Sequence, residues 1–236
     1  MQAYVQNGSE AVSFWETNPE NGAPVPVALT SGANAAATIG NMPPSVANAV
    51  AFCAAQSVAI APATAVFNGP APYVTTYPAP PVNGGLPAAQ PDVPRNVVAA
   101  WTGAAICTVK GVDSAGQAMS EVSASGTTFV GNKAFAFVTS ISFSAAVTAM
   151  TAGFGAKLGL PFRVSSGDIF GVTFNDAADA GTLVLADLTN PATSSTGDPK
   201  GTYTPAGTLN GAKYLAATLK VTDTTTQVGA WGIPQA

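Results

Sequence analysis

The sequence predicts an all-β protein: an antiparallel β-sandwich or a jelly-roll or barrel-like domain, with an extended proline-rich N-terminal arm. Short segments in which apolar residues alternate with polar ones recur from residue 92 onward. Short stretches containing Gly, Asn and Asp separate them, and these residues favour turns. Short strands joined by such turns are typical of antiparallel sandwiches and barrels. At 236 residues the chain can bury a sizeable core without disulfides or metal.

We divide the chain into an arm, residues 1–45, and a β-rich domain, residues 46–236. Within the arm, residues 22–27 read GAPVPV. Prolines at alternate positions favour an extended, polyproline-like path, which is why we interpret the segment as an arm. A strand at the edge of the domain is an equally good interpretation of this segment.

The first part of the domain, residues 45–63, is ambiguous. Four residues follow helical spacing behind Pro44 and Ser45, a potential helix cap, whereas residues 57–60 resemble a strand. The residues with helical spacing are Val46, Ala49, Val50 and Cys53. We expect a strand from Ser57 onward. Residues 68–91 are rich in Pro and Gly and are predicted to form a loop or a protruding hairpin.

Regular strands are expected from Asp92 onward. Residues 96–101 and 106–110 are strand-like, and a turn at 112–117 leads back through 119–123 to form a hairpin.

Residues 127–130 are followed by a predicted Gly131–Asn132 turn and by a strand over 134–143, whose residues at alternate positions from 135 share one face. Further strands are predicted at 168–174, 182–186 and 214–222. The cluster Gly153, Gly155 and Gly159 has an imperfect dinucleotide-binding spacing and is interpreted as a glycine-rich turn.

Charged residues are unusually scarce. Only 20 of the 236 residues are charged, or 8%, against about 25% in ordinary domains. Between Glu20 and Asp92 there is none. A freely diffusing protein normally carries charges of both signs that oppose self-association. The composition is therefore typical of a protein in a permanent assembly, although secreted adhesins and surface-layer proteins share it.

Several classes of function are disfavoured. The eight basic residues are scattered from Arg95 to Lys220 and the net charge is −4, so we expect no nucleic-acid partner. No window of about 20 uninterrupted apolar residues predicts a membrane-spanning helix. Residues 1–20 lack the basic and apolar regions of a signal peptide, so we expect synthesis in a cytoplasm, which argues against a secreted adhesin.

Catalytic and metal-binding patterns are missing. The chain has no histidine, which removes the common catalytic triads and the usual zinc sites. A P-loop and a G-x-S-x-G motif are also absent. We therefore expect no enzyme activity, no cofactor, and no catalytic or metal-binding residue. Cys53 and Cys107 are interpreted as free buried thiols, with a disulfide formed after release from the cell as the alternative.

One group of aspartates is a candidate calcium-binding or catalytic site. Paired carboxylates could bind Ca²⁺ or catalyse hydrolysis. The EF-hand pattern is absent, however, and residues 175–181 resemble a polar loop between strands, so a solvated loop is the favoured interpretation. The group consists of Asp168, Asp176, Asp179 and Asp187.

The chain from Asp92 onward resembles a family of tailed-bacteriophage virion structural proteins of the capsid decoration or cement kind. The resemblance rests on an ordered series of segments: 92–97 (DVPRNV), 108–117 (TVKGVDSAGQ) with Glu121, 133–141, 157–161 (KLGLP) and 196–205 (TGDPKGTYTP). It covers residues 92–236. In this chain Pro199 stands where the family suggests a basic residue, and Lys200 follows it. The resemblance implies a structural role in the phage particle.

Together these observations predict a capsid cement or decoration protein on the virion surface, made in the host cytoplasm. Its partners would be the major capsid protein and copies of itself, with a homotrimer as the expected oligomer. Residues 20–45 would act as a tether. The alternative is a head fibre, tail-associated or adsorption protein that binds sugars through an aromatic side chain; an adhesin and a hydrolase rank below it. The candidate sugar-binding residues are Tyr73, Tyr77, Trp101 and Trp231.

Overall fold

The computed structural model describes residues 10–13, 44–68, 90–113, 117–160, 169–175, 177–187, 189, 197–213 and 215–219. These residues form strands, turns and loops and contain no helix, which confirms the predicted all-β class. The strands are β1 (Glu10–Ser13), β2 (Asn48–Val58), β3 (Arg95–Ala105), β4 (Cys107–Val112), β5 (Ala118–Val122), β6 (Gly126–Phe135), β7 (Phe137–Phe143), β8 (Val147–Gly159), β9 (Ile169–Phe174), β10 (Ala177–Ala178), β11 (Thr182–Leu185), β12 (Gly201–Thr204) and β13 (Leu215–Leu219).

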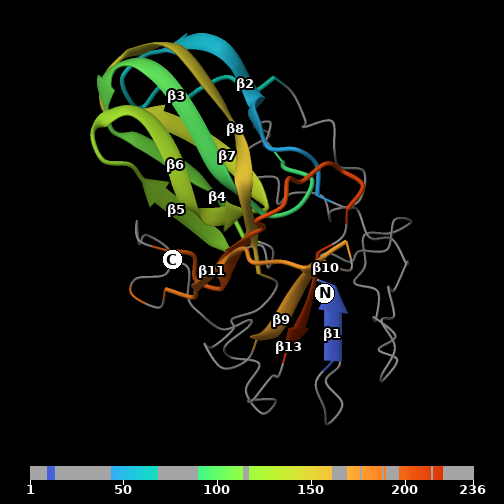
Figure 1. Ribbon diagram of the computed structural model, residues 1–236. Helices are drawn as coiled ribbons and strands as arrows, with labels where there is room; N and C mark the ends of the chain where they lie inside the picture. The colour runs from blue at the N-terminus through green and yellow to red at the C-terminus, as the bar shows by residue number, and fades with distance from the viewer. Residues whose placement is uncertain are drawn as a thin grey trace, which may run out of the picture.

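Two antiparallel sheets curl around one core (Figure 1). The first has the order β11-β12-β8-β3-β6, with β2 also paired to β8, and the second has the order β5-β4-β7. Between β3 and β8 the chain changes sheet four times, and two of these corners are a single residue long: Ile106 separates β3 from β4, and Ala136 separates β6 from β7. Strands that bend from one sheet into the other are the means by which orthogonally packed sheets form a barrel-like core.

The segment 61–68 joins the open edges of β2 and β7. On the β7 side, the Ala61 amide donates to the Phe143 carbonyl at 2.9 Å and the Ala65 amide donates to the Ile141 carbonyl at 2.8 Å. Thr64 forms a β-bridge with Ser142. The segment therefore continues the second sheet by a few residues.

On the β2 side, two side-chain amides take the place of a paired strand. Gln56 donates to the Val66 carbonyl at 2.7 Å and accepts from the Val66 amide at 2.9 Å. Asn68 accepts from the Ala54 amide at 2.9 Å and donates to the Val50 carbonyl at 3.3 Å. Part of the β2 edge is thereby covered, which removes backbone groups that could pair with another chain.

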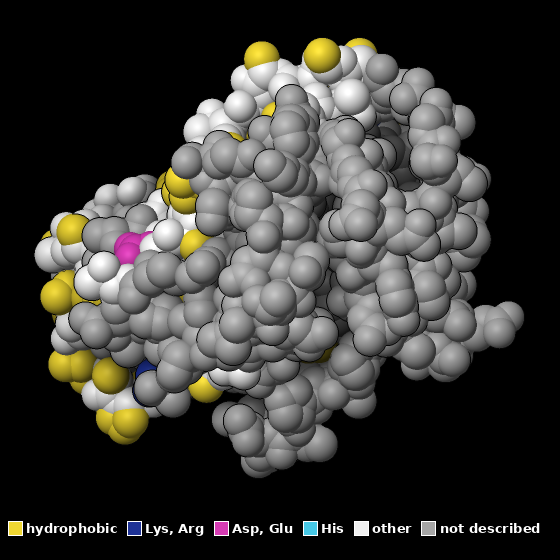
Figure 2. All heavy atoms as spheres, turned by 90° about the horizontal axis from the view of Figure 1, so that it is seen from below, with side chains coloured by type: hydrophobic (Ala, Val, Ile, Leu, Met, Phe, Trp, Pro, Cys, Tyr) yellow, Lys and Arg dark blue, Asp and Glu magenta, His cyan; other side chains and the backbone are white. Residues whose placement is uncertain are grey.

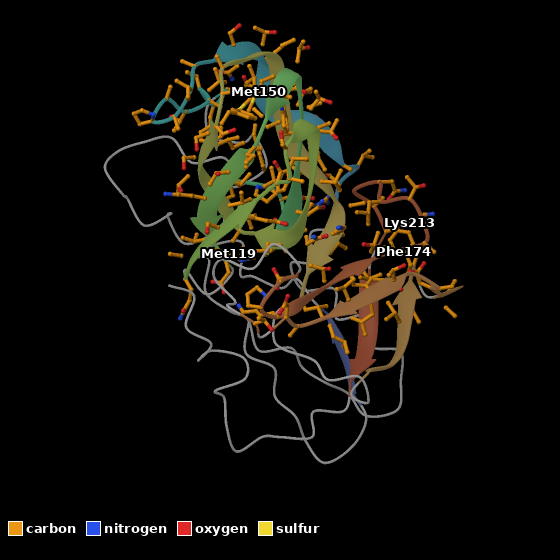
Figure 3. All side chains as sticks on the ribbon, turned by 90° about the vertical axis from the view of Figure 1, so that its left-hand side faces the viewer. Met119, Met150, Phe174 and Lys213 are labelled. Carbon is orange, nitrogen blue, oxygen red and sulfur yellow. The ribbon has the colours of Figure 1, made fainter. Side chains whose placement is uncertain are left out.

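The core lies between the two curled sheets. Val97, Ala99 and Trp101 alternate along β3 and point inward, as the period of a strand requires. Trp101 packs edge-on against Phe143, with ring centres 5.0 Å apart. Met150 and Met119 lie toward opposite ends of this core (Figure 3).

A separate four-stranded sheet, in the order β1-β13-β9-β10, lies below the curled sheets in Figure 1. The Lys213 ammonium lies 5.4 Å from the centre of the Phe174 ring, and the two side chains are neighbours in Figure 3. Strand β1 places residues 10–13 of the predicted arm in this sheet. The remainder of the arm up to residue 43, and residues 69–89 of the predicted loop, lie outside the described residues.

The predicted hairpin is confirmed, because β4 and β5 pair antiparallel from Thr108–Val122 to Val112–Ala118. The strand expected from Ser57 onward is wrong, since β2 begins at Asn48 and ends at Val58. The helical spacing was misleading because its residues do not share a buried face: Val50 is 51% exposed while Cys53 is fully buried. Pairing with β8 decides the conformation of this segment.

Glycines were misread as turns twice. Strand β6 continues through Gly131, where a Cβ would lie 2.8 Å from Glu121 Oε2. Strand β8 likewise contains all three residues of the predicted glycine-rich turn. At Gly153 a Cβ would collide with the Asn48 carbonyl oxygen of the neighbouring strand. These glycines permit close approach by other parts of the chain rather than reversal of direction.

Candidate functional site

Charged side chains gather inside the protein. Of the residues whose exposure the structure describes, the one charged side chain in the exposed class is Lys110. Seven charged residues are buried, although such residues are normally almost absent from interiors unless paired. The seven are Asp92, Arg95, Asp113, Glu121, Lys133, Asp198 and Lys200.

Arg95, at the start of β3, forms an ion pair with Asp92 at 2.8 Å. The same Asp92 oxygen accepts the Ser45 amide at 2.6 Å, and Arg95 donates to the Ser45 carbonyl at 2.8 Å. Arg95 also donates to the Gly155 carbonyl at 3.3 Å, and its guanidinium carbon lies 4.8 Å from the centre of the Phe154 ring. The pair thus binds the segment leading into β2 to both β3 and β8.

Glu121 on β5 reaches across to β6. Its carboxylate accepts the Asn132 amide at 2.6 Å and the Lys133 amide at 3.2 Å. Burial raises the pKa of the Glu121 carboxyl, although these two hydrogen bonds and the charges of Lys133 and Lys157 oppose the shift. The side chain therefore ties the two curled sheets together at a dry position.

Lys133 on β6 is completely buried. The negative charges that act on it are those of Glu121, Asp198 and Asp187. Burial lowers the pKa of the Lys133 ammonium to about 8, against the opposing effect of these carboxylates. Its proton is consequently held much less firmly than that of a surface lysine.

Asp198 lies in the turn that precedes β12. One oxygen accepts the Lys200 and Gly201 amides at 2.8 and 3.0 Å, and the other accepts the Ala134 amide of β6 at 2.8 Å. Burial raises the pKa of the Asp198 carboxyl to about 6, although these three amides and Lys200 oppose the shift.

The turn is also held through its lysine. Lys200 Nζ lies 3.2 Å from Asp113 Oδ2, at the end of β4. Asp113 in turn accepts the Gln117 amide at 2.9 Å, which links the end of β4 to the residue before β5. Together with Asp198, this ion pair fixes residues 197–201 against both curled sheets.

Lys157 completes the cluster from β8. Its ammonium donates to Asn132 Oδ1 at 2.7 Å and to the Gly131 carbonyl at 3.0 Å. With Lys157, the buried and half-buried charged side chains described so far comprise four acids and four bases: Asp92, Asp113, Glu121 and Asp198, and Arg95, Lys133, Lys157 and Lys200. We call these eight residues the charge network. The half-buried Asp187 also acts on Lys133.

The charge network uses the segments that carry the resemblance to virion proteins. Each of its eight residues falls within 92–97, 108–117, 133–141, 157–161 or 196–205, or is Glu121. Their burial was not predictable from local patterns in the sequence. The small number of charged residues was the available signal. In such a chain, an isolated charged residue within an apolar strand is a candidate for burial beside a residue of opposite charge.

The acidic group weighed as a calcium or catalytic site is not assembled by the residues described. Asp168 and Asp176 lie outside them, and across those residues no three acidic, Cys or His side chains are placed to hold a metal ion. Asp179 lies in the loop between β10 and β11, and its side chain is half-buried. Its carboxylate accepts the Tyr203 hydroxyl at 2.6 Å. It also accepts the amides of Gly181, Ala206 and Gly207.

The structure bears differently on the candidate sugar-binding aromatic residues and on the two cysteines. Trp101, one of the candidate sugar-binding residues, is 5% exposed and belongs to the core. Tyr73, Tyr77 and Trp231 lie outside the described residues. Cys53 and Cys107 are free and buried, as predicted. Burial raises the pKa of both thiols to about 12, with a further contribution at Cys107 from the charge of Glu121.

Large apolar side chains are exposed where charges would be expected. They belong to the β2 region, the corner after β3, and the outer positions of β5, β6 and β11: Val46, Val50, Ile60, Val66, Ile106, Val122, Val130, Val184 and Leu185. Seen from below, the part of the surface drawn in colour shows many hydrophobic side chains and very few charged ones (Figure 2). Within the part of the chain described, no helix is long and apolar enough to cross a membrane.

Comparisons with known proteins give no family. The chain matches no protein-family model, no curated protein and no solved structure. The resemblance to tailed-phage virion proteins, and the partners it implies, therefore stay predictions.

Proposed function

We propose that this protein is a non-enzymatic structural component of a bacteriophage particle, which binds the outside of the capsid shell as a cement or decoration protein. The observation that carries the proposal is the inverted placement of charge. The charge network lies inside, whereas the exposed surface displays apolar side chains such as Val66 and Val130, 73% and 63% exposed. An exterior of this kind favours association and lacks the charge that keeps monomers apart.

The mechanism follows from that surface. Each Å² of apolar surface removed from water contributes about 25 cal/mol, so modest patches sum to a large effect when repeated over a shell. A protein that binds only the assembled shell stabilises that shell by mass action. Binding would neither need nor tolerate many charges, because a buried unpaired charge opposes association.

The bonds that fasten the edges of the curled sheets also support the proposal. The segment 61–68 covers part of the β2 edge, and buried ion pairs fasten the turn at 197–201. A permanent component of a particle benefits from such fastening because local opening exposes backbone to proteases and to wrong partners.

The first experiment is to measure the copy number of this chain per purified virion by quantitative mass spectrometry, with the major capsid protein as the internal reference. A number in simple ratio to the capsid subunit is the expected result. A handful of copies per particle would overturn the cement proposal and favour the alternative, a fibre, tail or adsorption component.

Two exposed valines serve to locate the binding face. Val66 lies on segment 61–68, which covers part of the β2 edge. Val130 lies on β6, where it pairs with Val98 of β3. We expect Val66→Asp or Val130→Asp to abolish binding to stripped capsids, with unchanged circular dichroism because both side chains are exposed. Unchanged binding by both would contradict an apolar contact through these faces.

A further inference from the structure

Lys133, Glu121 and Asp198 meet at one dry place between three elements. Lys133 is on β6, Glu121 on β5 and Asp198 in the turn before β12, and each is at most 4% exposed. The two carboxylates bind consecutive amides of β6: Glu121 those of residues 132 and 133, and Asp198 that of residue 134. They therefore flank the residue from which the lysine side chain extends, and both act on its charge.

The protonation states at this place suit a condensation. An amine attacks a carbonyl carbon only when neutral, and a carboxyl group accepts the attack as the protonated acid. Burial lowers the pKa of Lys133 to about 8 and raises that of Asp198 to about 6. Moving one proton from the Lys133 ammonium to the Asp198 carboxylate gives two neutral reactants, and burial narrows the pKa difference that opposes this transfer.

The carboxyl group of Asp198 is held as an electrophile. Its Oδ1 atom accepts two backbone amides, those of Lys200 and Gly201, at 2.8 and 3.0 Å. Two fixed amides on one oxygen can stabilise the negative charge that develops there when a nucleophile adds to the carbon. The other oxygen, Oδ2, has one amide partner, that of Ala134. The third acid facing Lys133 is Asp187, which is less buried than Asp198 and accepts the Thr189 amide at 2.9 Å.

We propose that the folded chain joins Lys133 to Asp198 by an intramolecular amide bond, with Glu121 as the proton carrier. The neutral Lys133 Nζ adds to Cγ of protonated Asp198, forming a C–N bond and placing negative charge on Oδ1. Glu121 takes a proton from the nitrogen and delivers it to Oδ2. The C–O bond then breaks and water leaves. One amine and one acid give one amide and one water, Glu121 is regenerated, and nothing is oxidised or reduced.

Burial of both groups at one place, between β6 and the turn before β12, favours the amide. Effective concentrations of well-oriented groups within one molecule reach about 10⁵–10⁸ M, which offsets the unfavourable condensation seen between free molecules in water. The product is an uncharged group in a dry site. The reaction removes one acid and one base, so the formal charge of the site does not change. The bond would covalently lock β6 to the turn at 197–201.

The decisive measurement is the intact mass of the purified full-length chain after denaturation. The expected mass is that of the sequence less one water, and proteolysis should yield a branched peptide that contains both Lys133 and Asp198. A mass equal to that of the unmodified sequence would overturn the proposal and leave these residues as an ion network only. This outcome is independent of capsid binding, so it is distinguishable from failure of the proposed function.

Variants test the assignment of each atom. Asp198→Asn preserves the shape of the side chain, and its mass should be that of the variant sequence less one ammonia in place of one water. Lys133→Met should have the unreduced mass of its own sequence. Glu121→Gln should retain the fold, shown by circular dichroism, and form the bond slowly or not at all. The control is Lys110→Met, which changes an exposed lysine on β4 and should still lose one water. Loss of water from the Lys133→Met variant would refute the assignment to Lys133.

Discussion

At the scale of single residues, the ion pair of Asp92 and Arg95 illustrates why this protein buries charge. Both side chains are at most 3% exposed, and removing two charges from water costs several kcal/mol each. Their attraction offsets that cost only because additional hydrogen bonds occupy the same groups. Here the additional partners are the amide and carbonyl of Ser45. The pair therefore selects one position for the segment entering β2, which an apolar pair could not do.

Asp179 leads to a prediction about pH. Burial opposes ionisation, but the Tyr203 hydroxyl and three backbone amides outweigh it and hold the pKa of the Asp179 carboxyl below its ordinary value. A group whose pKa is lowered on folding stabilises the protein above its unfolded-state pKa of about 4, and this contribution is lost as the pH falls through the folded-state pKa. We expect Asp179→Asn to lower the free energy of unfolding at neutral pH by about 1 kcal/mol.

The measurement is urea unfolding of the wild type and the variant between neutral and strongly acidic pH. The difference between the two proteins should shrink at the acidic end, where the wild-type carboxyl is protonated. The control is Tyr203→Phe, which removes one of the four donors and should show a smaller effect of the same sign at neutral pH. A difference that does not change with pH would contradict the assignment.

At the scale of elements, strand pairing in this fold depends on where backbones approach closely. Strand β8 pairs with β2 on one side and β3 on the other, and Asn48 of β2 and Val97 of β3 both pair with its residue Phe154. Beside this position, Gly153 has no room for a side chain because the β2 backbone occupies the space. The pairing of β2 with β8 thus depends on the absence of a side chain at Gly153.

We expect Gly153→Ala to push β2 away from β8 and to lower the free energy of unfolding by about 1–3 kcal/mol, as overpacking does. Urea unfolding measures the change. The matched control is Gly126→Ala at the start of β6, where an added Cβ would meet no atom within 4 Å. This control should be neutral or slightly stabilising, since alanine restricts the unfolded chain. Equal effects at the two sites would show that the close approach at Gly153 does not limit stability.

At the scale of the whole molecule, the two thiols report on the integrity of the core. Cys53 and Cys107 lie in the same apolar cluster, contributed by β2 of one curled sheet and β4 of the other. Thiols react as thiolates, and burial raises the pKa of both to about 12. Neither should therefore react while the sheets remain closed around the core.

We expect a thiol-specific reagent to label neither cysteine in the native protein at mildly alkaline pH and to label both rapidly in urea. The labelling rate at intermediate urea should follow the unfolding transition observed by circular dichroism, because exposure of either thiol requires the core to open. Mass spectrometry of labelled peptides separates the two sites. Rapid labelling of one cysteine in the native protein would show that its sheet opens independently of the other.

Local patterns in the sequence predicted much of the fold. The β4–β5 hairpin was predictable because alternation over 106–110, turn residues at 112–117 and a second alternating segment are all local features. Buried positions on β7, such as Ile141 and Phe143, follow from the period of two along the same strand. The errors at Gly131 and Gly153 have the opposite origin, since what those glycines accommodate belongs to distant parts of the chain.

The sequence by itself determined the all-β class, most strands beyond residue 92, and the scarcity of charge, because composition and period-two alternation are properties of the chain alone. Only the tertiary structure decided that the charges lie inside, that segment 61–68 bridges β2 and β7, and that Lys133, Glu121 and Asp198 meet. The physical reason is that the burial and pairing of a charged side chain depend on contacts between strands far apart in the sequence. Lys133 and Asp198, 65 positions apart, come together only when β6 packs against the turn before β12.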